Sequence, residues 1–558
     1  MTPHTQRTLF FSLAASALSA STSSAQTLLY PKLGDKANDR LGVAVRSCGD
    51  VNNDGKNDFV VGAPEDGNLF GGGEGFVRVY SGANGATLYT INGVTNDDRF
   101  GVSVDGAGDV NGDGFADIVV GAPGFASGNG RVYVKSGANG TTNLYTFDSV
   151  AAFDAHGTVV AGVGDVNGDG RPDVLAASPT AAGGGSNRGT ARLYSGLTGA
   201  VLTTINGAVN GDRLGVSADG VGDLNGDGFG EFVIGSYFAG AKVYSGNGFG
   251  VLFTFSPTTG DDRLGFAVAG AGDVNGDGVP DIVVGAPQNG NIFAPGTGFA
   301  RIYSGATGAI IRTLNGGTAG DSFGISVGGA RDMDTDGKAE VIVGADQNPI
   351  AGVGYARVFK GSDGSVIATL NGLTASSDQG ISVDGLGDLE GNGSFEVIVG
   401  QSNASVPFGL AGRAEVWSLT VSGGCATPFT YCAVVNNSTG NSAQISSTGT
   451  VSIAANNFTL VATQCPLASP GVFFYGATQI QIPFGNGNRC VGGTLFRCPI
   501  ITTNGSGVGT FPFNFNAFTG PGQVTAGSTW KFQFWFRDAI TGPAFFNTSN
   551  ALSVTFCN

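Results

Sequence analysis

The chain has 558 residues, of which 41% are hydrophobic and 13% are charged, and its formal net charge is −16. This length and apolar content allow several domains with sizeable buried cores, and the 98 glycines show no collagen period. No basic patch accompanies the negative charge, so nucleic acid is not expected as a partner.

The first 25 residues have the features of a secretory signal peptide. Arg7 precedes an apolar stretch over residues 9–20, and Ser23 and Ala25 precede a plausible cleavage site before Gln26. No later apolar run reaches the roughly 18 residues that a membrane span requires. We therefore expect an exported protein, secreted or at the cell surface, with the periplasm as the alternative and with no membrane span.

From residue 50 the chain repeats a nine-residue acidic loop seven times, in the form Asp-x-Asn-x-Asp-Gly-x-x-Asp. The copies begin at residues 50, 109, 165, 223, 273, 332 and 388. Each period holds four β-type segments, and in the second repeat these lie near residues 101–108, 118–120, 131–135 and 143–147. A four-stranded unit with this period is typical of a propeller blade, which buries both faces only against its neighbours. The sequence predicts an all-β fold with a seven-bladed β-propeller over residues 26–421.

The loop composition predicts calcium. Ca²⁺ takes about six to eight oxygen ligands, which positions 1, 3, 5 and 9 and the carbonyl of position 7 can supply around a glycine turn. We expect up to seven ions, and the seven loops hold 22 of the 43 acidic residues. The candidate ligands are Asp50, Asn52, Asp54, Asp58; Asp109, Asn111, Asp113, Asp117; Asp165, Asn167, Asp169, Asp173; Asp223, Asn225, Asp227, Glu231; Asp273, Asn275, Asp277, Asp281; Asp332, Asp334, Asp336, Glu340; and Asp388, Glu390, Asn392, Glu396.

The acidic loop has two other interpretations. An EF-hand needs a glutamate at position 12 and flanking helices, but position 12 is Val61 in the first copy and Val120 in the second, inside apolar strand-like runs. Simple Asn/Asp/Gly turns remain the alternative, mainly for the irregular seventh copy.

Two further motifs flank each loop. Phe100-Gly101 precedes the first strand of the second repeat and Gly121-Ala122-Pro123 follows its second strand, and related pairs recur in the first and fifth repeats. In these residues the chain resembles FG-GAP proteins, the family that includes the propeller of integrin α subunits. The resemblance implies a seven-bladed propeller with Ca²⁺ loops between the first two strands of a blade. Repeats three, four, six and seven depart from the second motif.

Residues 27–42 align without gaps on residues 86–101, which include a fourth strand. The seventh repeat, in contrast, ends after its third strand. We therefore predict that residues 27–33 complete blade seven and close the ring, which removes open sheet edges.

Residues 422–558 differ in composition and are predicted to form a small β-sandwich domain. Trp530, Phe532, Phe534 and Phe536 share one face of a strand and are expected in its core. The opposite face, with Trp535, is expected to be solvated, and the alternative is a glycan-stacking platform. The domain resembles disulfide-bearing β domains that follow FG-GAP repeats in exported bacterial proteins.

Six of the seven cysteines lie in this C-terminal region, where an even set in an exported domain predicts three disulfides among 15 possible connectivities. The candidates are Cys425, Cys432, Cys465, Cys490, Cys498 and Cys557. We take Cys490–Cys498 as the first pair and Cys48 as a buried free thiol.

The sequence favours a non-catalytic protein. Apart from His4 in the signal, His156 is the one histidine, and it takes the aromatic position before Gly157. The predicted function is calcium-dependent adhesion or binding of an extracellular protein or glycan. The ligand face is expected opposite the loops, with Phe70 and Phe293 as candidates. The alternatives are a lectin or a polysaccharide lyase, and the lyase needs a clustered Arg/Lys/Tyr base that the sequence does not show.

Overall fold

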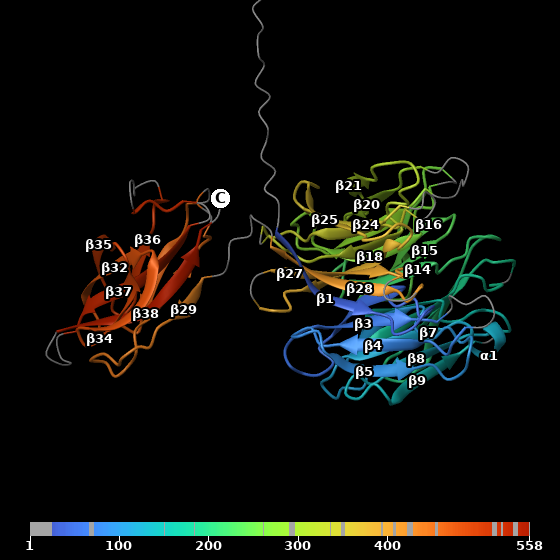
Figure 1. Cartoon of the computed structure of the whole chain (residues 1–558), viewed down its shortest axis with the longest axis horizontal. Coiled ribbons are helices and arrows are strands. Elements are labelled where there is room, and N and C mark those ends of the chain that lie inside the picture. The colour runs from blue at the N-terminus through green and yellow to red at the C-terminus, as the bar shows by residue number, and fades with distance from the viewer. Residues whose placement is uncertain are drawn as a thin grey trace, which may run out of the picture.

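The computed structural model describes residues 25–558 except for 66–71, 150, 184, 260–261, 289–295, 335, 348–351, 392–393, 406–408, 421–427, 452, 454–455, 516–521, 526–527, 539–544 and 557–558. Its strands form two bodies, one from β1 to β28 and the other from β29 to β38 (Figure 1). The predicted signal peptide lies outside the described residues except for Ala25, where β1 begins. Among the described residues, no helix has the length and apolar character that a membrane crossing needs.

The first body consists of seven four-stranded antiparallel sheets, one for each predicted blade. Blade one contains β2 (Ala44–Gly49), β3 (Asp58–Ala63), β4 (Phe76–Tyr80) and β5 (Thr87–Asn92). Blade two contains β6 (Val104–Gly108), β7 (Asp117–Ala122), β8 (Arg131–Lys135) and β9 (Asn143–Asp148). Blade three contains β10 (Val159–Gly164), β11 (Asp173–Ser178), β12 (Thr190–Tyr194) and β13 (Val201–Asn206). Blade four contains β14 (Ser217–Gly222), β15 (Glu231–Ser236), β16 (Gly240–Tyr244) and β17 (Val251–Phe255).

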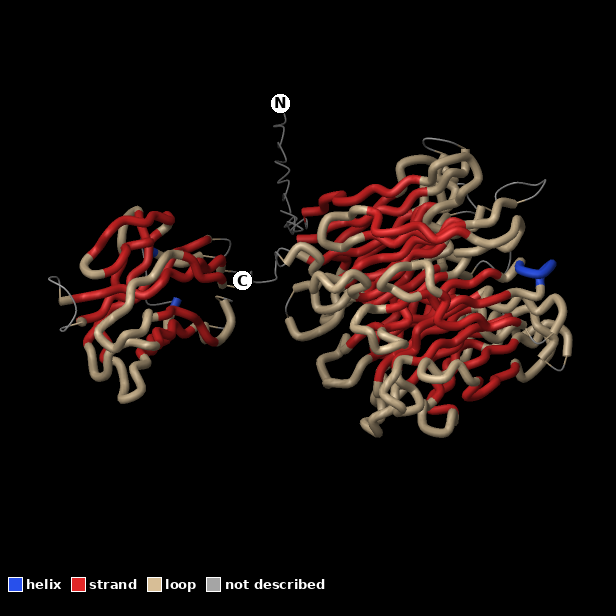
Figure 2. Tube along the Cα trace, turned by 90° about the horizontal axis from the view of Figure 1, so that it is seen from below, coloured by secondary structure: helices blue, strands red, loops and turns tan. Residues whose placement is uncertain are grey.

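The remaining blades follow the same order until the last. Blade five contains β18 (Ala267–Gly272), β19 (Asp281–Ala286), β20 (Phe299–Tyr303) and β21 (Ile310–Asn315). Blade six contains β22 (Ser326–Gly329), β23 (Val341–Ala345), β24 (Tyr355–Phe359) and β25 (Val366–Asn371). Blade seven contains β26 (Gln379–Gly387), β27 (Phe395–Gln401), β28 (Arg413–Thr420) and β1 (Ala25–Leu33). The described residues include one short helical turn, α1 (Phe125–Gly128), in a loop of blade two (Figure 2).

The blades pack against one another through hydrophobic clusters, and each of these clusters is shared by two successive blades. The second strand of a blade lies in the middle of this packing, and all residues of β7 are buried. Its run of β-branched residues is suited to a strand buried on both faces. The cluster between blades seven and one contains Phe59 and Val416, so the ring is closed.

The two glycine motifs mark the closest approach of neighbouring blades. Gly101, after the motif phenylalanine, has a φ of +88°, a conformation that glycine adopts without strain. A Cβ atom at Gly62, in the second motif of blade one, would lie 1.9 Å from the carbonyl oxygen of Gly101. A side chain at either position would separate the blades.

Strand β1 lies at the outer edge of blade seven, where the sequence predicts a strand over residues 27–33. It pairs with β28 in antiparallel register, with Thr27 opposite Ser418 and Leu33 opposite Arg413. The Tyr30 ring packs against Gly85 of blade one. A Cβ atom added at Gly85 would lie only 2.5 Å from this ring. β1 therefore contacts both the last and the first blade.

The second body has three sheets. The five-stranded sheet contains β29 (Phe429–Tyr431), β38 (Phe546–Thr555), β37 (Thr529–Arg537), β32 (Pro470–Gly476) and β35 (Phe496–Thr502), in this order. The three-stranded sheet contains β30 (Gln444–Thr448), β31 (Thr459–Thr463) and β36 (Gly509–Pro512), and the hairpin contains β33 (Thr478–Phe484) and β34 (Gly487–Gly492). One aromatic-rich cluster fills the space between the first two sheets, as in a β-sandwich.

The two faces of β37 differ from a simple core-and-solvent arrangement. The four predicted core residues lie in the aromatic cluster. The prediction of a solvated opposite face is wrong for Gln533, which is fully buried. Its side chain accepts a hydrogen bond from the Cys490 amide (2.9 Å) and donates to the carbonyls of Asn488 and Ser549 (2.7 Å each). The β33–β34 hairpin thus covers part of this face.

The first predicted disulfide is also wrong. Cys490 is bonded to Cys432, whose Cα atom lies 6.1 Å away. The reason is that Cys490 packs in the small cluster with Phe474, whereas Cys498 lies in the aromatic cluster with Cys465. Cys465 and Cys498 are buried free thiols and form no disulfide, and Cys48 is a buried free thiol as expected. The candidates Cys425 and Cys557 lie outside the described residues.

Candidate cation-binding loops

The seven acidic loops all connect the first strand of a blade to the second. In blade two the loop runs from Asp109, after β6, to Asp117, the first residue of β7. Because every blade has the same strand order, the loops gather at one end of the propeller. The structure therefore places the 28 predicted ligands, apart from the undescribed Asn392, in seven equivalent connections.

The carboxylate at position 9 is buried in every loop and fastens it to the blade. In blade two, Asp117 accepts hydrogen bonds from the amides of Val110 and Gly137, both at 2.9 Å. The bond from the amide of position 2 recurs in all loops; it joins Asp58 to Val51, Asp173 to Val166, Glu231 to Leu224, Asp281 to Val274, Glu340 to Met333 and Glu396 to Leu389. Position 9 is thus a structural anchor as well as a predicted ligand.

Side chains at positions 1 and 3 fold inward over the loop backbone. In blade two the amide of Asp113 donates to Asp109 Oδ1 (3.0 Å) and to Asn111 Oδ1 (2.8 Å), and the amide of Gly114 donates to Asp109 Oδ2 (3.0 Å). The same bonds from positions 5 and 6 recur in the first, third and fifth loops. In these four loops the side-chain oxygens of positions 1 and 3 therefore accept backbone amides of the same loop.

Burial has an electrostatic cost for these anchors. It raises the pKa of Asp58, Asp117, Asp173 and Asp281 to about 6, with the neighbouring loop carboxylates adding to the shift. Burial likewise raises the pKa of Glu396 to about 7 and that of Glu340 to about 8. A nearby cation would favour the ionised form, and oxygen-only donors suit a hard cation such as Ca²⁺.

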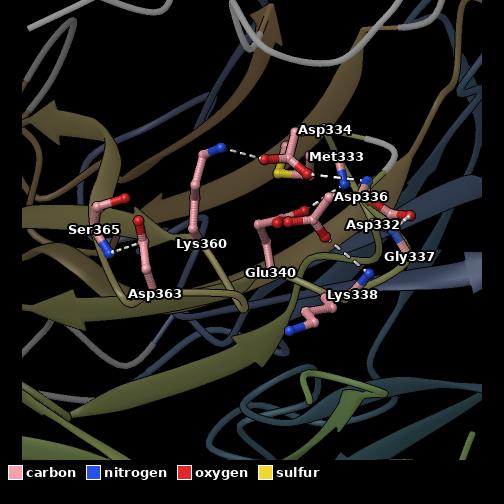
Figure 3. Close-up of polar contacts among 10 residues, drawn as sticks. All are labelled: Asp332, Met333, Asp334, Asp336, Gly337, Lys338, Glu340, Lys360, Asp363 and Ser365. Carbon is pink, nitrogen blue, oxygen red and sulfur yellow. Dashed lines mark hydrogen bonds and ion pairs between the residues drawn. The ribbon is translucent and has the colours of Figure 1, made fainter. Parts of the chain in front are cut away.

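The sixth loop has the most compact arrangement. Carboxylate oxygens of Asp332, Asp334, Asp336 and Glu340 all lie within 4.8 Å of one another. Figure 3 shows the four side chains converging beside Lys360, whose Nζ lies 2.5 Å from Asp334 Oδ2. One oxygen of Glu340 accepts the Met333 amide, while the other, Oε1, is buried without a hydrogen-bond partner. The donor set fits a divalent cation.

The seventh loop keeps only part of this pattern. Glu396 accepts the amide of Leu389 (2.7 Å), and Asp388 accepts the amide of Gly391 (2.6 Å). Asn392, the predicted ligand at position 5, lies outside the described residues.

His156 occupies a buried position in blade three. Its Nδ1 lies 3.0 Å from Ser178 Oγ and its Nε2 lies 3.0 Å from the Tyr194 hydroxyl, and both His156 and Ser178 have no exposed surface. Burial lowers the pKa of His156 to about 4, and nearby Arg192 adds to the shift. A serine and histidine in contact are a catalytic pattern, but this pair is closed to a substrate.

The opposite end of the propeller holds two features that the sequence did not reveal. A cavity of about 210 Å³ opens at the mouth of the central channel, and its lining includes Phe266, Ser217 and Arg46. Nearby, the Tyr237 ring contacts two guanidinium groups, with its centroid 5.2 Å from Arg213 and 4.4 Å from Arg263. These residues come from three separate connections, so no local motif marks them. The ligand candidates Phe70 and Phe293 lie outside the described residues.

Several repeats have an Asp-Arg pair immediately before the first motif, as Asp98-Arg99 stands before Phe100-Gly101, and these pairs form turns at this end of the propeller. Asp98 accepts the amide of Thr95 (3.0 Å), and Arg99 adopts a φ of 55°. The aspartates at this place are buried and cap their own loop, as Asp212 does for the amide of Val209 (2.8 Å).

Comparison with known proteins places these features in a family. The FG-GAP repeat model matches residues 42–80, 100–134, 156–194 and 264–303. Integrin alpha-5 of Xenopus laevis is 29% identical over 209 residues, or 34% of this chain and 19% of that protein. Integrin alpha-V of Gallus gallus is 28% identical over 214 residues, or 35% of this chain and 20% of that protein. The chain thus contains four matched FG-GAP repeats within the propeller and is similar to integrin α subunits over about a third of its length. Its propeller is integrin-α-like.

An enzyme is also among the similar proteins. Phosphatidylinositol-glycan-specific phospholipase D of Bos taurus is 34% identical over 178 residues, or 28% of this chain and 21% of that protein. The chain therefore spans only about a fifth of the length of these relatives.

Proposed function

We propose that this protein is an exported, calcium-stabilised propeller that binds an extracellular protein or glycan and has no catalytic activity. In this proposal residues 1–25 are a signal peptide, residues 26–421 form the propeller and residues 422–558 form a separate β-sandwich domain. Up to seven Ca²⁺ ions bind the predicted loop ligands.

One observation carries the proposal: every loop has a buried position-9 carboxylate, and in the sixth loop this carboxylate lies with three further carboxylates whose oxygens are within 4.8 Å of one another. Buried negative charges that lie close together destabilise a fold unless a cation compensates them. Calcium would therefore stabilise the connection between the first two strands of each blade. The ligand would bind at the opposite end of the propeller.

Calcium-dependent stability tests the first part. Ions that bind only the folded chain raise its stability by RT ln(1 + [L]/Kd), so the melting temperature should rise with CaCl₂ and fall with EDTA. Asp113→Ala removes an exposed loop ligand and should reduce the calcium-dependent rise. Glu74→Gln removes an exposed acid outside the loops and serves as the matched control. A melting temperature that ignores EDTA would contradict the proposal.

The ligand face is proposed at Tyr237 and its neighbours. Phe238 beside it is half exposed, and their rings contact at 4.7 Å. The exposed ring of Phe238 and the partly exposed ring of Tyr237, which contacts two guanidinium groups, suit stacking on a sugar or on another ligand with a flat face. A glycan array probed with and without EDTA, and with Tyr237→Ala, tests this site. Binding that the variant loses supports a lectin.

The Arg213–Tyr237–Arg263 cluster also favours the rival function, a polysaccharide lyase, because it brings together the residue types that such chemistry needs. A lyase would release products with new unsaturated ends from an acidic polysaccharide. Incubation with such a polysaccharide and detection of these ends decides between the two functions.

A further inference from the structure

Blade six departs from its sister blades in two places at once. Position 3 of the acidic loop is asparagine in the first five loops, Asp334 in the sixth and Glu390 in the seventh, and only the sixth loop also keeps acids at positions 1, 5 and 9. A second position, at the end of the third strand, is Lys360 in blade six and serine in the other six blades, as Ser81, Ser136, Ser195, Ser245, Ser304 and Ser418. The extra acid and the only lysine at this place thus occur in the same blade.

The two departures meet in space. Lys360 Nζ lies 2.5 Å from Asp334 Oδ2, and the Asp334 side chain is only 2% exposed, against 29% for Lys360. The other oxygen of Asp334 accepts the amide of Asp336 at 3.2 Å. Figure 3 shows Lys360 directed at Asp334, while Lys338 of the same loop extends away from the four carboxylates. The lysine is therefore held against the acidic cluster by a nearly buried ion pair.

In another blade, too, the residue at the place of Lys360 contacts the acidic loop. In blade three the hydroxyl of Ser195 donates to Asp169 Oδ2 at 3.1 Å. A neutral side chain thus contacts the loop there, and a cationic side chain does so in blade six. A change at this place alters the charge beside the cluster without altering the strand.

The sixth loop has four carboxylates and every other loop has three, so the ammonium group of Lys360 offsets the additional one. Asp363 is a nearby acid outside the loop, and it accepts a hydrogen bond from the amide of Ser365 at 2.7 Å. Glu340 Oε1, buried and without a hydrogen-bond partner, lies in the same cluster and gives it an oxygen suited to a cation.

We infer that Lys360 is a tethered counter-ion that holds the affinity of the sixth loop for a divalent cation below the value its four carboxylates would give. The inference rests on the proposed cation binding by the loops and specifies how one of the seven sites is adjusted. A fixed positive charge a few ångströms from a divalent ion repels it even through water, so the effect on the dissociation constant is about tenfold or more.

The test measures each loop separately in the full chain. Hydrogen exchange followed by mass spectrometry gives the calcium concentration at which the peptide over residues 332–340 becomes protected. Lys360→Ser and Lys360→Met should lower this midpoint about tenfold, Asp334→Asn alone should raise it, and the Lys360→Ser/Asp334→Asn double variant should return near the original value. Ser304→Lys, which adds the charge to blade five, should raise the midpoint of the loop over residues 273–281.

The outcomes separate this inference from the proposed function. A midpoint of the sixth loop that stays unchanged or rises in both Lys360 variants, while the other loops still respond to calcium, would overturn the inference alone. If no loop responds to calcium, the proposed cation binding fails and the inference fails with it.

Discussion

Removal of β1 measures how much the closed ring contributes to stability. A chain that begins at Gly34 loses eight residue pairs between β1 and β28 and the contact of Tyr30 with blade one. At roughly 0.5 kcal/mol for each pair, the low end of the net value of a hydrogen bond, the loss is about 4 kcal/mol. Unfolding entropy of about 2.1 cal/mol/K per residue converts this loss, for a propeller of this size, to a fall in melting temperature of about 5 °C.

Calorimetry in saturating calcium compares the truncated and complete chains. A synthetic peptide with the sequence of residues 25–33 should restore the melting temperature by mass action, since it can occupy the vacated edge of β28. The same peptide with Tyr30→Ala should restore less, because it lacks the ring that packs on Gly85. A truncated chain that melts at the temperature of the complete chain would refute the closing role of β1.

Three further predictions concern His156, Gln533 and the disulfide of Cys432. The pKa of His156 is lowered to about 4, so its contribution to stability is complete above the unfolded pKa of about 6.5 and is lost as the pH falls towards 4. In guanidinium unfolding, the original chain should therefore lose about 2 kcal/mol more stability between pH 7.5 and 5 than the His156→Phe variant does. An equal loss in both chains would contradict this. Gln533→Leu leaves the amide of Cys490 without its acceptor and should destabilise the C-terminal domain by about 3 kcal/mol. The exposed Gln479→Leu is its control, and equal melting of the two variants would count against the buried role. Cys432→Ala opens a disulfide between residues 58 apart and should cost about 4 kcal/mol, seen as a melting temperature that no longer depends on reductant.

The sequence was informative where function depends on residues that are near one another in the chain. Each predicted cation site lies within nine residues, so the spacing of Asp109 to Asp117 already defines its ligands. The role of Asp117 as an anchor was not visible, because its second hydrogen bond comes from Gly137, in the turn after the third strand. The Lys360–Asp334 pair was missed for the same reason.

The remaining features depend on contacts between segments that are far apart in the sequence, and these contacts were not predicted. Tyr237 and its two arginines come from three connections, and the sequence separations gave no sign that they meet. The predicted Cys490–Cys498 pair fails because Cys490, on the β33–β34 hairpin, and Cys498, on β35, pack in different clusters.

The sequence by itself determined the number of blades, their strand order and the place of the acidic loops, because each repeat encodes its own alternation of strands, turns and oxygen donors. The aligned copies also predicted a strand over residues 27–33, where β1 pairs with β28. Only the tertiary structure decided which side chains from different repeats meet, as Tyr30 meets Gly85 and Lys360 meets Asp334. Such contacts depend on the packing of whole blades around the ring, and no local pattern in the chain records that packing.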